Sequence, residues 1–166
     1  DFVKKLGEDI VARFRCYNHN PFGNCVYAGT TSTFQTRLYI NEEYMKCDLK
    51  IIIVSCVPHP GAGFGGGSKM VMPGIASYES IKWNHMTREG ENRAPRGAGA
   101  KPTQGMGLID ENPFKKDVDE CAELAGIDFL INAIVNTRGE IVSIYAGEWQ
   151  QAQAAAVTEA KTHYRT

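Results

Sequence analysis

Three features that mark common classes of protein are missing from this 166-residue sequence. Its longest apolar runs, such as residues 51–54, are far shorter than the ~20 residues that cross a bilayer. No charged stretch followed by an apolar core opens the chain in the way a secretory signal does. Eighteen basic and nineteen acidic side chains give a formal net charge of −1, which offers no case for nucleic acid or an anionic membrane. The sequence therefore predicts that the protein does not cross a membrane and does not bind nucleic acid or an anionic membrane surface.

The cysteines lack the spacing of a zinc knuckle or a redox dithiol. There are five of them, and no two form a Cys-x-x-Cys pair. Scattered single thiols fit a reducing compartment, so the sequence predicts a cytoplasmic protein. The chain begins at Asp1 instead of methionine, in what reads as the middle of a helix. We therefore expect it to be a piece of a longer protein.

The composition is that of one globular domain, with 43% hydrophobic and 22% charged residues. The strongest strand signal is residues 49–57. This run is apolar on both faces and predicts a central parallel strand covered by helices. Further strands are expected at 10–17 and 35–40. Two more, at 127–136 and 140–146, are separated by a short hairpin turn.

Helical patterns separate these strands. The segments expected to be helical are residues 3–9, 42–46, 76–86, 114–125 and 150–164. Residues 89–106 lack apolar periodicity and are interpreted as a long exposed loop. The alternation of strands and helices predicts an α/β fold in a single domain over residues 1–166. We expect a mixed, largely parallel sheet flanked by helices, with a β-hairpin and a helix at the C-terminal end.

A glycine-rich loop follows the strongest strand. Residues 61–67 contain five glycines in seven positions, between His59 and Lys69. Glycines let backbone N–H groups approach a ligand closely, and ligands bind at the carboxyl ends of strands in open α/β sheets. The loop therefore predicts a binding site, the alternative being a flexible turn without function.

Two nucleotide-binding patterns fit this loop poorly. The spacing Gly61-x-Gly63-x-x-Gly66 satisfies the dinucleotide fingerprint, but Pro73-Gly74 interrupts the long helix that should begin there. A P-loop has lysine before serine, whereas here Ser68 precedes Lys69. A Rossmann-like oxidoreductase that binds a free dinucleotide stays open as the second hypothesis.

The loop and the helix after it resemble the nickel-dependent lactate racemase family. The residues that carry this resemblance are Pro58-His59, Ala62-Gly63-Phe64, Gly66-Gly67-Ser68-Lys69, Pro73-Gly74-Ile75-Ala76-Ser77 and Asn84-His85. Residues 111–113, 126–132 and 139–147 are similar as well, so the resemblance covers most of residues 10–160. It implies the central part of the N-terminal domain of such a protein.

Members of that family racemise or epimerise a 2-hydroxy acid such as lactate, by reversible hydride transfer to a nickel-pincer nucleotide. The resemblance implies an isomerase in which Lys69 carries this cofactor through a covalent thioamide. It also implies that His85 is the ligand to nickel and that His59 is an acid or base at the substrate hydroxyl. The residues expected to bind the cofactor are Lys69, Phe64, Gly66 and Gly67.

The residue types suit these roles without reference to the family. A neutral imidazole is a good ligand for Ni(II), and histidine exchanges protons near neutral pH. A lysine in a partly desolvated pocket can lose its proton and become a nucleophile. The alternatives are that His85 only packs beside Ile81 and that Lys69 is a solvated or anion-binding lysine. His19 is expected to bond local backbone. Four basic residues could contact an anion, but they are interpreted as solvated loop charges: Arg88, Arg93, Arg96 and Lys101.

Parts of the family pattern have no counterpart in this sequence. These are an upstream phosphate-contacting segment, a second catalytic histidine and a closing C-terminal domain, while Gly65 replaces a common serine. We therefore expect a fragment of a cofactor-binding N-terminal domain, inactive alone. Its expected partners are a 2-hydroxy acid substrate and the missing segments of a two-domain protein, with a homo-oligomer left open. An inactive scaffold module is the remaining alternative.

Overall fold

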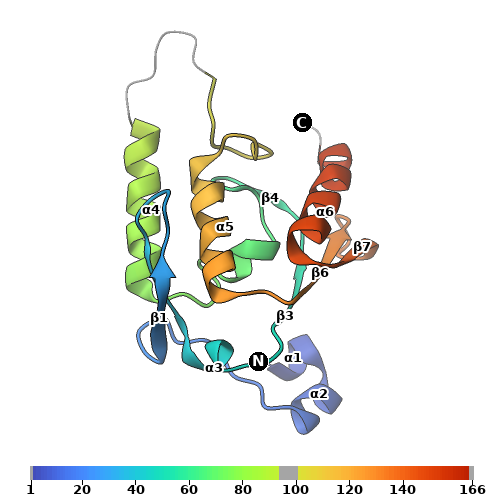
Figure 1. Cartoon of the computed structure of the whole chain (residues 1–166). Coiled ribbons are helices and arrows are strands. Elements are labelled where there is room, and N and C mark those ends of the chain that lie inside the picture. Colours follow the sequence, from blue (N-terminus) through green and yellow to red (C-terminus); the bar gives the residue numbers. More distant parts are fainter. Residues whose placement is uncertain (1, 94–100, 165–166) are drawn as a thin grey trace.

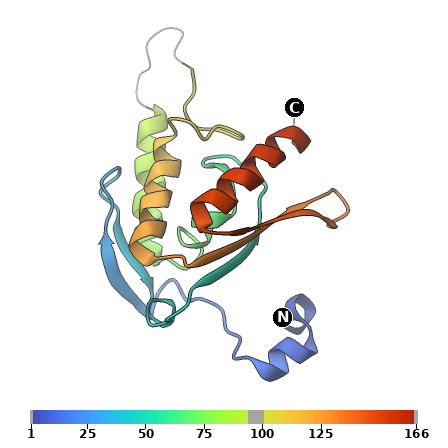
Figure 2. The same cartoon turned by 45° about the vertical axis from the view of Figure 1, so that its right-hand side comes forward.

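The computed structural model of the chain describes residues 2–93 and 101–164. It begins with two short helices, α1 (Phe2–Leu6) and α2 (Glu8–Arg13), which contain no buried residue and lie to one side of the other elements (Figures 1 and 2). The strand expected at 10–17 is wrong, because residues 8–13 are helical. The acidic residues Glu8 and Asp9 in the first turn favour a helix there.

The remaining elements alternate between strands and helices. In chain order they are β1 (Cys25–Thr30), β2 (Arg37–Asn41), α3 (Glu42–Met45), β3 (Ile51–Ser55), β4 (Pro58–His59), β5 (Gly63–Phe64), the 3₁₀ helix η1 (Gly67–Met70), α4 (Tyr78–Arg93), α5 (Pro113–Ala125), β6 (Phe129–Val135), β7 (Ile141–Gly147) and α6 (Trp149–His163). The prediction of an α/β fold that ends in a β-hairpin and a helix is confirmed.

The main sheet has the order β3-β6-β7. Strand β3 runs parallel to β6, with Ile51 opposite Phe129, and β6 pairs with β7 in the antiparallel direction. Parallel pairing of the apolar strand is therefore confirmed. Its central position is not: within the described residues β3 lies at the edge of the sheet, with Ile52 buried and Ile53 72% exposed. An apolar run shows which side chains avoid water but not how many neighbours a strand has.

Helices cover one face of this sheet. Helix α6 packs on β6 and β7, and α5 lies between η1 and α4 (Figures 1 and 2). The antiparallel pair β1-β2 packs beside these helices, β1 against α5 and β2 against α4. Strand β1 was not expected from the sequence. This arrangement brings the loop after β3 against the N-terminal half of α5.

Helix α4 is longer than the sequence predicts. Ser77 caps it, since its Oγ accepts a hydrogen bond from the backbone N–H of Ser80 at 3.2 Å. The helix then continues to Arg93, so the expected loop at 89–106 is wrong over its first residues. Arg96 lies outside the described residues, and Lys101 is exposed as expected.

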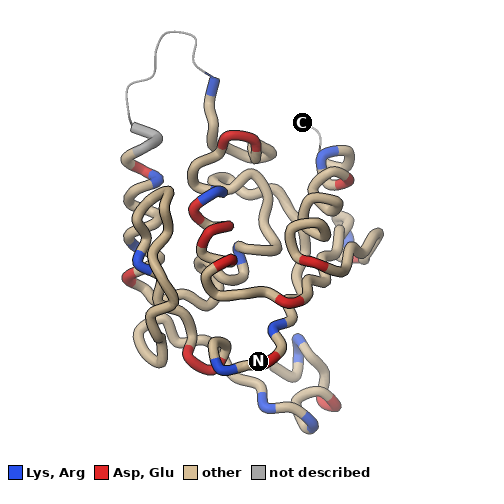
Figure 3. Tube along the Cα trace, in the orientation of Figure 1, with Lys and Arg blue, Asp and Glu red and all other residues tan. Residues whose placement is uncertain are grey.

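The distribution of charged residues and the state of the cysteines agree with the sequence. Acidic and basic residues are interspersed along the part of the trace that the structure describes (Figure 3). All five cysteines are free thiols. In the described residues, no helix combines the length and the apolar character that crossing a bilayer requires.

Candidate functional site

The glycine-rich loop is held by side chains from β6 and α6. Asn132 donates to Oε1 of Gln153 at 2.8 Å, and Gln153 donates to the carbonyl of Gly65 at 3.0 Å. Gly66 and Gly67 have φ values of +85° and +48°. A Cβ on Gly67 would lie 2.7 Å from Oε1 of Gln153. Backbone conformation and close packing therefore both require glycine at these positions, and their contact with a cofactor stays a prediction.

The loop does not provide the context of a dinucleotide site. Gly61 and Gly63 lie in the β4-β5 hairpin, and Gly66 is followed by the single 3₁₀ turn Gly67–Met70. The dinucleotide fingerprint places the pyrophosphate at the N-terminus of a long helix that begins inside it. Such a helix does not begin here, so the geometry gives no support to the second hypothesis.

Lys69 lies in the 3₁₀ turn and is buried, with 8% of its surface exposed. Its Nζ is 5.0 Å from the ring centroid of Phe114. Burial, and then the positive charges of Arg88 and Lys115, lower the pKa of Lys69 to about 8. Roughly a tenth of the amine is then neutral at pH 7, far more than for a solvated lysine. The amine is therefore suited to nucleophilic attachment.

His85 stands against the same aromatic ring. Its imidazole meets Phe114 edge to face, with centroids 5.6 Å apart. Nδ1 lies 2.9 Å from the carbonyl oxygen of Ile81. Since a carbonyl can only accept, Nδ1 carries the proton and the lone pair of a neutral ring is on Nε2. Burial lowers the pKa of His85, which favours this neutral form. A backbone-oriented neutral imidazole is the usual form of a metal ligand.

His59 has the opposite tautomer. Its Nδ1 accepts the backbone N–H groups of Gly61 and Ala62 at 3.1 and 3.0 Å, so a neutral ring carries its proton on Nε2. Burial, and then the positive charges of Lys69 and Arg88, lower the pKa of His59 to about 4. At neutral pH, His59 is therefore a neutral hydrogen-bond donor through Nε2.

Two further residues belong to this cluster: Phe114, which the sequence did not single out, and Arg88, for which it favoured solvent. The ring of Phe114 is fully buried where α5 begins, and Cζ of Arg88 lies 5.2 Å from its centroid. Arg88 is half-buried in α4, so its interpretation as a solvated loop charge is wrong. One signal was available, because residue 88 follows His85 by three positions and shares its helix face.

Phe64 and His19 lie elsewhere. Phe64 is 2% exposed in a hydrophobic cluster with Cys56 and Ile134, and its contact with a cofactor stays a prediction. His19 hydrogen bonds to the carbonyl of Ala76 and to the side chain of Asn41, at 2.9 and 3.1 Å. The expectation that it bonds local backbone is wrong, because these partners are distant in sequence.

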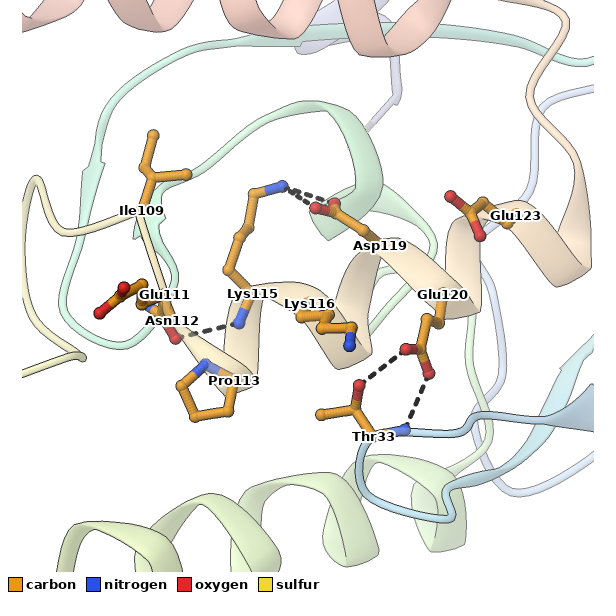
Figure 4. Close-up of a pocket in the computed structure, with 10 residues that line it drawn as sticks. All are labelled: Thr33, Ile109, Glu111, Asn112, Pro113, Lys115, Lys116, Asp119, Glu120 and Glu123. Carbon is orange, nitrogen blue, oxygen red and sulfur yellow. Dashed lines mark hydrogen bonds and ion pairs between the residues drawn. The ribbon is translucent and has the colours of Figure 1, made fainter.

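A cavity of about 640 Å³ runs along α5 (Figure 4). The described residues that line it are Thr33, Ile109, Glu111, Asn112, Pro113, Lys115, Lys116, Asp119, Glu120 and Glu123. His59, Lys69 and His85 are not among them. Asp119 pairs with Lys115 at 2.5 Å and accepts the hydroxyl of Ser68 at 2.6 Å. The cavity wall therefore supports the 3₁₀ turn that carries Lys69, without containing the predicted site.

The side chains present determine how a metal could be held. Across residues 2–93 and 101–164, no group of three or more His, Cys, Asp or Glu side chains could hold a metal ion. His85 would be a single protein ligand, and a metal bound there would need its other ligands from a cofactor. A buried lysine and a single imidazole on one aromatic ring fit a metal-bearing cofactor attached covalently.

Comparison with known proteins places this site in a family. Residues 1–97 match the family model of the lactate racemase N-terminal domain. The chain belongs to this family. The resemblance read from residues 58–85 is thereby confirmed.

Two lactate racemases lie among the relatives of this family member. The enzyme of Thermoanaerobacterium thermosaccharolyticum is 30% identical over 150 residues, which are 89% of this chain and 33% of that protein. The enzyme of Lactiplantibacillus plantarum is 31% identical over 154 residues, 92% of this chain and 34% of that protein. The chain thus spans about a third of the length of these relatives.

Solved structures share the fold. The structure of the lactate racemase apoprotein from T. thermosaccharolyticum superposes with a TM-score of 0.85 at 28% identity, over 95% of this chain and 36% of that one. A crystal structure of a Thermotoga maritima protein superposes with a TM-score of 0.70 at 23% identity, over 98% of this chain and 42% of that one. The second match concerns the fold alone.

Proposed function

We propose that this chain is the cofactor-bearing part of a longer racemase or epimerase that acts on a 2-hydroxy acid. The observation that carries the proposal is the buried amine of Lys69, which shares the ring of Phe114 with the imidazole of His85. A low lysine pKa and an imidazole with its lone pair on Nε2 are what covalent attachment and metal ligation require. The names of the two lactate racemase relatives agree with this activity.

The residues present fit a nickel-pincer nucleotide. Lys69 would hold it through its amine, and His85 would bind nickel through Nε2. When bound, this group supplies a metal-activated carbon that accepts and returns the hydride of the substrate. Phe64, Gly66 and Gly67 remain the proposed neighbours of the cofactor, Gly66 and Gly67 by leaving the backbone open to it.

His59 would act on the C2 oxygen of the substrate. Its Nδ1 is occupied by two backbone N–H groups, so Nε2–H can donate to that oxygen as the hydroxyl becomes a carbonyl. A fixed donor stabilises negative charge that develops on the oxygen. While the neutral ring keeps this tautomer, the group that takes the hydroxyl proton has to be another one. We assign that role to a histidine supplied by the longer polypeptide.

The chain is proposed to work with further segments of its parent protein. It covers about a third of its lactate racemase relatives, and one face of its main sheet is apolar and open at Ile51, Ile53 and Ile144. A racemase also needs a second proton-transferring group. The proposed partners are therefore those segments and a 2-hydroxy acid, in the cytoplasm, with oligomerisation left open.

The test compares the parent polypeptide with the 166-residue chain. Both are expressed with the cofactor pathway and supplied with nickel, and chiral chromatography follows conversion of L-lactate to D-lactate. We expect conversion by the parent only, lowered roughly 100-fold or more by His59→Gln, with His163→Gln as a control. Conversion by the 166-residue chain would refute the need for further segments. A loaded parent that converts no 2-hydroxy acid would refute the proposed function.

A further inference from the structure

We propose that Arg88 is the anion-binding residue of this site, and that its guanidinium holds a carboxylate or phosphate oxyanion. The proposal rests on the proposed function, because it places Arg88 beside the lysine and histidines assigned there. The roles proposed for His59, Lys69 and His85 leave the carboxylate of the substrate and the phosphate of the cofactor without a cationic partner in this chain.

The guanidinium is held in a fixed position. It lies over the ring of Phe114, with Cζ 5.2 Å from the centroid, and against the loop backbone at Gly61. A Cβ added to Gly61 would come within 2.4 Å of Nη1 of Arg88 and 3.1 Å of the Phe114 ring. Glycine at position 61 therefore makes room for the guanidinium. An arginine held this way loses little entropy when it binds an anion.

The surroundings of Arg88 have an excess of positive charge. His59, Lys69 and His85 are close enough that the charge of Arg88 acts on each of them. The positive charges of Lys69 and Arg88 act on His59, and those of Arg88 and Lys115 act on Lys69, although Lys115 is itself paired with Asp119. The charge of Glu89 acts on His85, but Glu89 is exposed. Gathering basic groups in a half-buried site is unfavourable unless an anion joins them.

Arg88 also has hydrogen-bonding capacity to spare. Its Nε is buried and has no hydrogen-bond partner among the described residues. A buried N–H without an acceptor is unfavourable, so such a group in a native site indicates that a ligand binds there. A planar guanidinium fork matches the two oxygens of a carboxylate or phosphate. Packing on Phe114 covers the face of the guanidinium but leaves its Nε–H without an acceptor.

Two anions of the proposed reaction carry oxygens that a guanidinium can bind. One is the carboxylate of the 2-hydroxy acid, and the other is the phosphate of a nucleotide cofactor. The structure assigns the oxyanion to Arg88, and the experiment separates the two sources.

The experiment measures anion binding by the 166-residue chain produced without the cofactor pathway. Isothermal titration calorimetry is carried out with L-lactate and, separately, with inorganic phosphate. The chains compared are wild type, Arg88→Met, Arg88→Lys and Lys82→Met. Lys82 is an exposed basic residue of the same helix and controls for loss of one positive charge from α4.

We expect wild type to bind at least one anion and Arg88→Met to bind it roughly tenfold more weakly or worse. Arg88→Lys keeps the charge but not the fork and should lie between them, while Lys82→Met should match wild type. Binding of lactate alone assigns the substrate carboxylate, and binding of phosphate alone assigns the nucleotide. Binding of neither anion by wild type, or equal binding by Arg88→Met, would overturn the proposal.

A second measurement covers the case in which Arg88→Met does not fold. Phenylglyoxal modifies arginines of the wild-type chain, and the peptide containing Arg88 is followed by mass spectrometry with and without each anion. Protection of Arg88, with Arg138 in the same digest unprotected, supports the site, and no protection contradicts it. Neither readout needs a loaded cofactor. An unmodified Lys69 would refute the attachment while leaving anion binding by Arg88 measurable.

Discussion

Single residues carry the chemistry proposed for this chain, and Lys69 shows how. Its amine is buried beside other cations, which lowers its pKa from 10.5 to about 8. The rate of its labelling by an amine reagent should therefore rise steeply up to about pH 8 and level off above it. Mass spectrometry of the Lys69 peptide gives this profile. In urea the midpoint should move to about 10.4, the value of an unfolded lysine. A folded-state midpoint near 10 would contradict the described burial.

Single residues also show which features of the site can be predicted from the sequence and which cannot. The family resemblance predicts His59, Lys69 and His85 as site residues, because it fixes their positions in the chain, and their roles stay predictions. The position of Arg88 on Phe114 depends on how α4 packs against α5, which no local pattern encodes. The tautomer of His59 likewise depends on two backbone N–H groups of a loop whose conformation appears only in the fold.

At the scale of elements, the glycine-rich loop depends on support from β6 and α6. Gly67→Ala would force a side chain to within 2.7 Å of Gln153 in a left-handed backbone conformation. We expect it to lower the free energy of unfolding by about 2 kcal/mol. Gly65→Ala is the matched control, since its Cβ would meet no atom closer than 3.5 Å. Urea unfolding measures both, and equal stabilities for the two variants would be incompatible with the packing described here.

Elements were predicted best where turn chemistry marked their ends. Helix α5 spans Pro113–Ala125, close to the expected 114–125, with Asn112 as its N-cap and Gly126 after its end, and β6 and β7 form the expected hairpin. The errors at residues 10–17 and in β1 have different causes. A short segment with mixed apolar residues fits a strand or a helix, and at residues 8–13 the acidic first turn favours the helix. Strand β1 is defined by its antiparallel pairing with β2, which a short segment does not encode by itself.

At the scale of the whole molecule, the proposal that the chain works as part of a longer protein concerns the open face of its main sheet. One face of the main sheet is packed by helices, while the other leaves Ile53 and Ile144 at 72% and 59% exposure. Sequence periodicity identified β3 as apolar on both sides, and that pattern fits a strand that further chain covers. Two observations agree with this proposal. Strand β3 lies at the edge of the sheet in the described residues, and the chain covers about a third of the length of its lactate racemase relatives.

The central claim is that Lys69 carries a nickel-bearing cofactor with His85 as ligand. The most direct measurement is the mass of the Lys69 peptide, together with bound nickel, after expression of the chain with the cofactor pathway. The account predicts a covalent adduct on Lys69 and about one nickel per chain. His85→Ala should lose the nickel, and His163→Ala should keep it. Unmodified Lys69 with no nickel bound, from cells that modify a lactate racemase in parallel, would contradict the account.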